Sequence, residues 1–316
     1  NDELKYFSEY SPYMYYNFCD INKHFNWKSV WIKIISNNKK ILIYFKYKKI
    51  FNCAFFWSPQ TILGDLSLLN IKKIKDFLEK EIKIKYIYIR INLSNEKKEI
   101  YYNYMRINGW KSPFKKIISS YNTVIINSYL NDEELKIKIS KNFFRTIKKS
   151  KNEFNKNLQI IYLKNLNLHK VQELYNDCKQ VKNIDTSYLN KLNYLKEMCG
   201  ENFLVGCIEK NNKIVSLRII YIGKKISLDF VNLTNNVGRL NLSNYYISNE
   251  ILKYIFKNNL TKKFDFSGID QINNKDVANF KLGFSGKSFI SNLGEYEYSN
   301  NLIMRLIINF ILFFTK

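Results

Sequence analysis

The hydrophobic and polar positions of this chain predict the same order of elements twice. In each stretch, three strands of alternating pattern come first, and a helix, a strand, a second helix and a last strand follow. The first stretch covers residues 30–126 and the second covers residues 203–292. A duplicated order of this kind indicates two related α/β units. Between the two stretches, residues 131–198 show helical spacing interrupted by one short strand.

Local turn signals set the bounds of the expected elements. The predicted strands are 30–35, 41–47, 50–56, 86–91, 123–126, 158–163, 203–209, 214–221, 226–233, a strand around Phe264, and 287–292. The predicted helices are 69–82, 100–107, 131–151, 169–179, 186–198, 244–256 and 274–281. Lys48-Lys49 is expected to be a hairpin turn, and Asn108-Gly109 is typical of a helix end.

The length of 316 residues agrees with two domains. We expect an N-terminal domain over residues 1–126, a C-terminal domain over residues 127–300, and an apolar helix over residues 301–316 that packs back on the first domain. That last segment is too short to span a bilayer. It is interpreted as a buried helix or as a helix lying at a membrane surface, anchored by Phe310, Phe313 and Phe314.

The formal net charge is +24, which favours a polyanionic partner such as RNA, a phosphate-rich substrate or anionic lipid. The chain is also rich in Lys, Asn and Ile throughout, and a general enrichment in lysine explains the charge equally well. The five cysteines are widely spaced and form no CxxC pair, so no metal site is predicted. We expect the thiols to be reduced and buried, which is typical of a cytoplasmic protein. Such a protein is either free in the cytoplasm or located at the inner face of the membrane.

Two segments near the end of the second stretch carry the clearest motif. Residues 263–270 read Lys-Phe-Asp-Phe-Ser-Gly-Ile-Asp, and residues 280–286 read Phe-Lys-Leu-Gly-Phe-Ser-Gly. Together they resemble the C-terminal half of the Fem-type peptidyltransferases, which belong to the GNAT superfamily of N-acyltransferases. Residues 57–65, 104–110 and 143–150 resemble further family segments in the same order. The resemblance implies an α/β fold with a mixed sheet and two tandem GNAT-like domains.

The resemblance also implies a function. A Fem-type enzyme is expected to move an amino acid from aminoacyl-tRNA to an amine of a peptidoglycan precursor, which is a lipid- or nucleotide-linked glycan. No cofactor is then needed beyond the tRNA donor. Two alternatives remain: an acyl-CoA-dependent N-acyltransferase that acts on an amino sugar in surface polysaccharide biosynthesis, and a non-catalytic GNAT-like module that binds RNA or a membrane. The sequence does not set the oligomeric state.

The motif supplies the candidate catalytic residues. The resemblance places Lys281 over the reacting carbonyl, where a cation stabilises developing negative charge. Asp265 and Asp270 flank the Ser-Gly turn, and one of them is expected to orient the amine or act as base. Ordinary helix-end and turn chemistry explains the same three residues without catalysis.

The candidate substrate-binding residues are more dispersed. Gly268 serves backbone geometry at the turn, and Phe280 is expected to pack against substrate or in the core. The basic helix end with Arg145 and Lys148 is expected to hold phosphate, and the alternative is a solvated surface. The remaining candidates are Tyr188, from the family's substrate cleft, and Arg239, a phosphate ligand.

Two positions depart from the patterns of the superfamily. The loop that cradles the acyl-CoA pyrophosphate carries several glycines, but residues 235–244 here contain one glycine and do not fit it. Asn92 stands where the first domain of the family has an aspartate. The first departure disfavours acyl-CoA as donor, and the second removes one candidate base.

Overall fold

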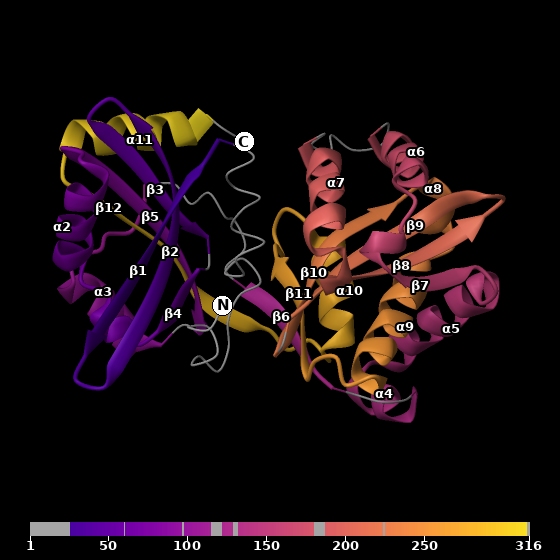
Figure 1. Ribbon diagram of the computed structural model, residues 1–316. Coiled ribbons are helices and arrows are strands. Elements are labelled where there is room, and N and C mark those ends of the chain that lie inside the picture. The colour runs from indigo at the N-terminus through magenta and orange to yellow at the C-terminus, as the bar shows by residue number, and fades with distance from the viewer. Residues whose placement is uncertain are drawn as a thin grey trace. The chain divides into compact units, whose positions relative to one another are not determined.

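The protein divides into two compact units (Figure 1). One unit combines segments from both ends of the chain, and the other consists of its middle part. This computed structural model describes residues 26–59, 61–96, 98–114, 122–128, 132–179, 187–223 and 225–314. Unit 1 comprises residues 1–121 and 291–316, and unit 2 comprises residues 122–290. Each unit contains a sheet with helices packed on it, so the predicted mixed α/β class is confirmed.

Unit 1 contains a mixed sheet in the order β1-β2-β3-β5-β12, with the short β4 paired to β2. Its strands are β1 (Lys28–Ser36), β2 (Lys39–Ile50), β3 (Cys53–Pro59), β4 (Ile62–Gly64), β5 (Tyr86–Glu96) and β12 (Ile290–Ser299). β3 and β5 run parallel because helix α2 (Ile71–Ile82) connects them, and the other neighbours are antiparallel. Helix α3 (Glu99–Ile107) follows β5.

The two faces of this sheet are built differently. On one face, Ile87, Ile89 and Ile91 of β5 pack in a hydrophobic core with residues of α2 and α3. On the other face, Tyr88 and Arg90 alternate with them and are fully buried. That second face carries a network of buried charges.

Helix α11 (Leu302–Phe314) is attached to unit 1 through Glu297 of β12, which is also fully buried. Arg305 Nε donates to Glu297 Oε1 at 2.7 Å, and Asn309 Nδ2 donates to Glu297 Oε2 at 3.0 Å. Tyr88 donates its hydroxyl to the same carboxylate, and Arg90 pairs with Glu295 beside it. Buried charges of this kind are tolerated because each has an opposite charge and hydrogen bonds.

Unit 2 contains a sheet in the order β6-β11-β10-β9-β8-β7. Its strands are β6 (Asn122–Asn127), β7 (Leu158–Tyr162), β8 (Phe203–Lys210), β9 (Lys213–Ile222), β10 (Ile226–Thr234) and β11 (Lys263–Ile269). β7 to β10 form an antiparallel meander, β10 and β11 run parallel, and β6 pairs antiparallel with β11.

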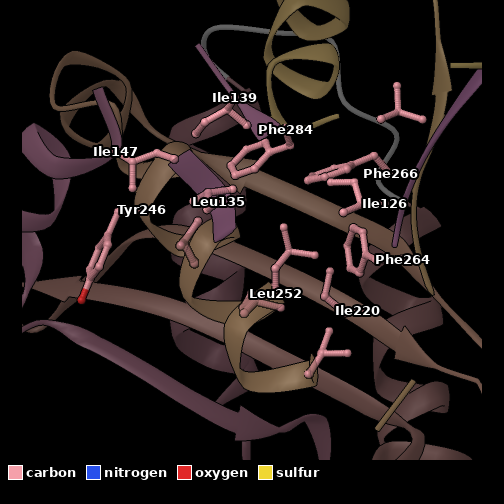
Figure 2. Close-up of a cluster of buried hydrophobic side chains, with 14 of the residues drawn as sticks. Ile126, Leu135, Ile139, Ile147, Ile220, Tyr246, Leu252, Phe264, Phe266 and Phe284 are labelled. Carbon is pink, nitrogen blue, oxygen red and sulfur yellow. The ribbon is translucent and has the colours of Figure 1, made fainter. Parts of the chain in front are cut away.

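Helices cover both faces of the unit 2 sheet (Figure 1). The helices are α4 (Asp132–Lys138), α5 (Lys141–Phe154), α6 (Leu168–Lys179), α7 (Ser187–Cys199), α8 (Asn236–Leu240), α9 (Ser243–Lys257) and α10 (Lys275–Phe284). α5 and α9 pack on one another on one side, and α6 lies against β9 and β10 on the other. The core under α5 and α9 is drawn in Figure 2, where Phe264 and Phe266 of β11 lie close to Phe284 of α10 and Ile220 of β9.

The last strand of each half of the chain belongs to the sheet of the other half. β6 follows the first half but pairs with β11 in unit 2, and β12 follows the second half but pairs with β5 in unit 1. The units therefore change at residues 122 and 291, whereas the sequence analysis placed the boundaries after residues 126 and 300. Helix α11 is part of unit 1.

Three local predictions were wrong. β2 continues through Lys48 and Lys49, and the turn is formed by Phe51 and Asn52. The single helix expected over 131–151 is two helices, because the Ser140 side chain accepts a hydrogen bond from Phe143 N and starts α5 anew. The final strand begins at Ile290 and extends to Ser299, beyond the predicted 287–292.

The close approach of α10 to α5 yields a stability prediction. A Cβ atom at Gly283 would lie 2.0 Å from Phe143, whose ring is packed against Tyr245 and Phe284. Gly283→Ala should lower the free energy of unfolding by about 1–3 kcal/mol, because overpacking outweighs the higher helix propensity of alanine. Denaturant unfolding measures the change. Asn279→Ala, at an exposed position of the same helix, is the control and should not destabilise; equal stability of both variants would contradict the packing seen at Gly283.

Candidate functional site

The candidate site lies where two parallel strands of unit 2 stop pairing. β10 and β11 are in register only over three pairs, from Ile226–Lys263 to Leu228–Asp265. Immediately afterwards, each strand has a bulge toward its other neighbour, β10 between Asp229 and Val231 and β11 between Asp265 and Gly268. Bulges at such points redirect side chains and frequently lie beside functional sites.

Ser267 holds the bulge of β11 in a conformation that is unusual for a residue with a side chain. Its φ is +64°, in the left-handed region. Its backbone N–H donates to Asp265 Oδ1 at 2.7 Å, and its hydroxyl donates to the carbonyl oxygen of Asp229 at 2.8 Å. These two bonds compensate the backbone strain and tie β11 to β10 where their ladder ends.

Lys281 of α10 reaches this point from the helix that follows β11. Its Nζ donates to the carbonyl oxygen of Gly268 at 2.9 Å. Burial lowers the pKa of the Lys281 ammonium, although the carboxylates of Asp229 and Asp265 act in the opposite direction. The motif residues Lys281, Gly268 and Asp265 are therefore brought together, and the cation is held in a partly dehydrated position.

Asp265 is the carboxylate of the motif that belongs to the site. Its Oδ1 accepts hydrogen bonds from the Thr123 hydroxyl and from Ser267 N. Burial raises the pKa of the Asp265 carboxyl above its ordinary value, and the nearby Asp229 adds to the rise, while the hydrogen bonds and Lys281 oppose it. A carboxyl with a raised pKa is better suited to accept a proton near neutral pH.

Two further charged residues complete the cluster, and the sequence analysis missed both. Arg218 of β9 is 1% exposed, and its Nη1 lies 3.3 Å from Asp229 Oδ2. The guanidinium also lies 5.6 Å from the ring centre of Phe266 and 5.3 Å from that of Phe280. Burial raises the pKa of Asp229, with Arg218 and Lys281 opposing it. The signal available in the sequence was a charge in the middle of each of two strongly apolar strands.

Some polar atoms of this pair have no partner among the described residues. Arg218 Nε and Nη2 and Asp229 Oδ1 are buried without a hydrogen bond. Buried polar atoms are otherwise nearly always satisfied, so such a group of them indicates a ligand or water position.

Asp270 and Phe280 have structural contacts that account for them. Asp270 Oδ1 accepts from the backbone N–H groups of Ile272 and Asn273, and its Oδ2 accepts from the Asn273 side chain. Phe280 lies edge-on to Tyr245 and Phe284 in the core, with Arg218 against its face. In this structure Asp270 therefore stabilises the turn, and Phe280 packs in the core.

The other predicted binding residues do not contact the cluster in any described interaction. Arg145 and Lys148 are exposed on α5, with Lys148 Nζ 5.2 Å from the Phe144 ring centre. Arg239 Nε donates to the carbonyl oxygen of Thr234 at 3.1 Å. Tyr188 is on α7, but its side chain lies outside the described residues, as do those of Phe313 and Phe314.

Asn92, the position of the missing family aspartate, is buried on β5 of unit 1. Among the described residues, no group of His, Cys, Asp and Glu side chains is arranged to hold a metal ion. Burial raises the pKa of the Cys199 and Cys207 thiols to about 11, so neither is activated as a nucleophile. No helix within the described ranges is long and apolar enough to cross a membrane.

Solved structures of similar shape identify the fold. A crystal structure of FemX superimposes with a TM-score of 0.78 over 97% of this chain and 96% of that chain, at 13% sequence identity. The chain has the fold of FemX. The fold that the resemblance to the Fem-type family implies, a mixed α/β fold in two units, is thus confirmed. No protein-family model matches the chain, and no curated protein sequence matches it.

Two other structures share the fold less closely. A conserved protein of unknown function from Bacteroides thetaiotaomicron matches with a TM-score of 0.56 and 12% identity, covering 93% of this chain and 92% of that one. The C-terminal domain of a putative lysylphosphatidylglycerol synthetase from Agrobacterium fabrum matches with a TM-score of 0.52 and 10% identity, covering 88% and 86%.

The buried pair leads to a prediction about stability. Arg218→Met should lower the free energy of unfolding by about 3–5 kcal/mol, because it leaves the Asp229 carboxylate buried without its closest cation. The double variant Arg218→Met/Asp229→Leu should recover a large part of this loss, because both charges are then absent. A double-mutant cycle by denaturant unfolding measures the coupling. If the losses of the two single variants simply added up in the double variant, Arg218 and Asp229 would not be energetically coupled, and the prediction would be wrong.

Proposed function

We propose that the protein is a Fem-like aminoacyltransferase that moves an amino acid from aminoacyl-tRNA to an amine of a peptidoglycan precursor. The observation that carries the proposal is Lys281, held by the Gly268 carbonyl beside Asp229 and Asp265 at the point where β10 and β11 separate. The FemX fold and that of a putative lysylphosphatidylglycerol synthetase support a transferase of this class.

The proposed chemistry assigns one task to each charged group. The acceptor amine attacks the ester carbonyl of the aminoacyl-tRNA, so that a C–N bond forms and negative charge develops on the carbonyl oxygen. The Lys281 ammonium stabilises this oxyanion. The C–O bond to the terminal ribose then breaks, the leaving oxygen takes a proton, and an amide remains.

The proton balance of that reaction involves Asp265. The attacking amine must lose a proton, and the Asp265 carboxylate accepts it, since its raised pKa suits this task. The Lys281 ammonium, with its lowered pKa, donates a proton to the leaving ribose oxygen and regains one from the carboxyl of Asp265. Asp229 is fixed by Arg218 and serves to position Lys281 electrostatically.

The segment before α9 supports aminoacyl-tRNA over acyl-CoA as donor. Its backbone N–H groups are used within the segment: Gly238 N donates to Asn235 Oδ1, and Arg239 N donates to Asn235 O. Asn241 N and Leu242 N likewise donate to carbonyl oxygens of α8. A pyrophosphate cradle needs N–H groups that point at the ligand instead. The short helix α8 occupies the segment that would otherwise form such a loop.

The positive charge of the chain suits both proposed substrates, since a tRNA and a diphosphate-linked precursor are polyanions. Exposed cations such as Arg145 and Lys148 are proposed to contribute to this attraction. The proposed location is the cytoplasm, where charged tRNA is available.

The proposal is tested by transfer of a labelled amino acid from a set of charged tRNAs to a peptidoglycan precursor. The wild-type protein should transfer label, and Lys281→Met should reduce turnover by about 10²–10³-fold, as expected for loss of an oxyanion-stabilising group. The free energy of unfolding should stay the same or rise, because burial disfavours the ammonium in the native state.

Lys275→Met, at an exposed position on the same helix, is the matched control and should transfer label at the wild-type rate. Acetyl-CoA with amino-sugar acceptors forms a parallel arm of the assay. Turnover with acetyl-CoA alone would replace the proposal with an acyl-CoA-dependent reaction. Binding of tRNA without turnover by any donor would indicate a non-catalytic module, and equal rates for Lys281→Met and wild type would remove Lys281 from the mechanism.

A further inference from the structure

The outer face of α11 is apolar and exposed. Six described side chains share this property: Leu302, Ile303, Leu306, Ile307, Phe310 and Ile311. Their spacing places them on one face of the helix. The inner face carries Arg305 and Asn309, which bind Glu297. The helix is thus fixed to the sheet partly by polar contacts and exposes six of its apolar side chains to solvent, which is unusual for a surface helix.

A second exposed apolar element lies at the same end of unit 1. The turn between β2 and β3 presents Ile50 and Phe51, and Phe51 is 90% exposed. Asn52 of this turn accepts hydrogen bonds from Lys85 N and Tyr86 N. Asn300, just before α11, donates from its side chain to the carbonyl oxygen of Lys85 at 2.8 Å. The turn and the start of α11 are therefore neighbours, as Figure 1 also shows. We call these eight apolar residues the end patch.

Lysines surround the end patch. Lys48 and Lys49 precede the turn, and Lys83 and Lys85 lie beside it; all four are exposed. Lys49 Nζ donates to the carbonyl oxygens of Ile82 and Lys83, which fixes its position at this end. Helix α2 carries three acids: Asp76 and Glu79 both lie within ion-pair distance of Lys75, and the third is Glu81. The rim of the end patch is thus predominantly positive.

We propose that the end patch is a docking surface for an anionic lipid bilayer. Phe51, Phe310 and the aliphatic side chains enter the boundary between headgroups and acyl chains, to the depth that interfacial helices reach. The four lysines lie at the level of the anionic headgroups, which attract them. Charge complementarity favours this occupant over a second copy of the chain, because the same positive rim would then face itself.

This inference does not rest on the proposed transferase activity, because it concerns binding by a different surface. It gives a role to all six apolar side chains of α11 that are exposed in the described part of the chain. It also predicts that unit 1 approaches the membrane by the end that carries α11 and the β2–β3 turn.

Co-sedimentation with lipid vesicles tests the docking surface. The full chain should bind vesicles of phosphatidylcholine and phosphatidylglycerol at least about 10-fold more tightly than vesicles of phosphatidylcholine alone, and raised salt should weaken the binding. The triple variant Phe51→Ser/Ile303→Ser/Phe310→Ser should bind at least about 10-fold more weakly, because apolar insertion is lost. A second variant, Lys48→Gln/Lys83→Gln/Lys85→Gln, should lose the preference for the anionic vesicles.

The matched control is Ile137→Ser/Ile272→Ser, which removes two equally exposed apolar side chains of unit 2 and should bind vesicles as the wild type does. Circular dichroism of each variant excludes unfolding as the cause of lost binding. Failure of the wild type to bind either vesicle, or equal losses in the control, would overturn the proposal. It would also be overturned if the wild type were a dimer that the triple variant converts to a monomer, since the patch would then join two copies.

Discussion

The constraint on which unit 2 depends is the burial of four charged side chains where β10 and β11 separate. Moving an ion out of water costs several kcal/mol, and only paired charges and hydrogen bonds offset that cost. Arg218 and Asp229 satisfy one another in part, and the aromatic faces of Phe266 and Phe280 accommodate the guanidinium. Lys281 and Asp265 are held by backbone and hydroxyl groups of the strands themselves. The same arrangement that costs stability shifts the pKa values in the direction that acid–base chemistry needs.

Unit 1 carries an ion network of similar composition with a different consequence. Glu297 accepts from Tyr88, Arg305 and Asn309, and burial together with this carboxylate raises the pKa of the Tyr88 phenol. Here the carboxylate is bonded on both oxygens, so the network fixes α11. The contrast with Asp229, whose Oδ1 has no partner among the described residues, separates a structural ion cluster from a candidate site.

The sequence predicted the duplicated order of elements and the residues of one motif, because both are local. Alternating strands, helical spacing and the Phe-Asp-Phe-Ser-Gly segment are properties of neighbouring residues. The exchange of β6 and β12 between the sheets was not predictable in this way, since either pairing satisfies the same alternation. Arg218 and Asp229 were missed for a similar reason: they meet through strand register and a bulge, which no local pattern specifies. Ser140, in contrast, was a readable N-cap inside a helix that had been predicted as continuous.

The central claim is that burial lowers the pKa of Lys281 although the neighbouring carboxylates of Asp229 and Asp265 raise it. A direct titration of that side chain tests this claim most closely. The measurement is a pH titration by NMR of isotope-labelled lysine side chains, with Lys281→Met identifying the resonance. The account predicts a midpoint below the 10.5 of an unperturbed lysine, and a still lower midpoint in Asp229→Asn, because the Asp229 carboxylate raises the pKa of Lys281. A midpoint at or above the ordinary value, unchanged in Asp229→Asn, would contradict it.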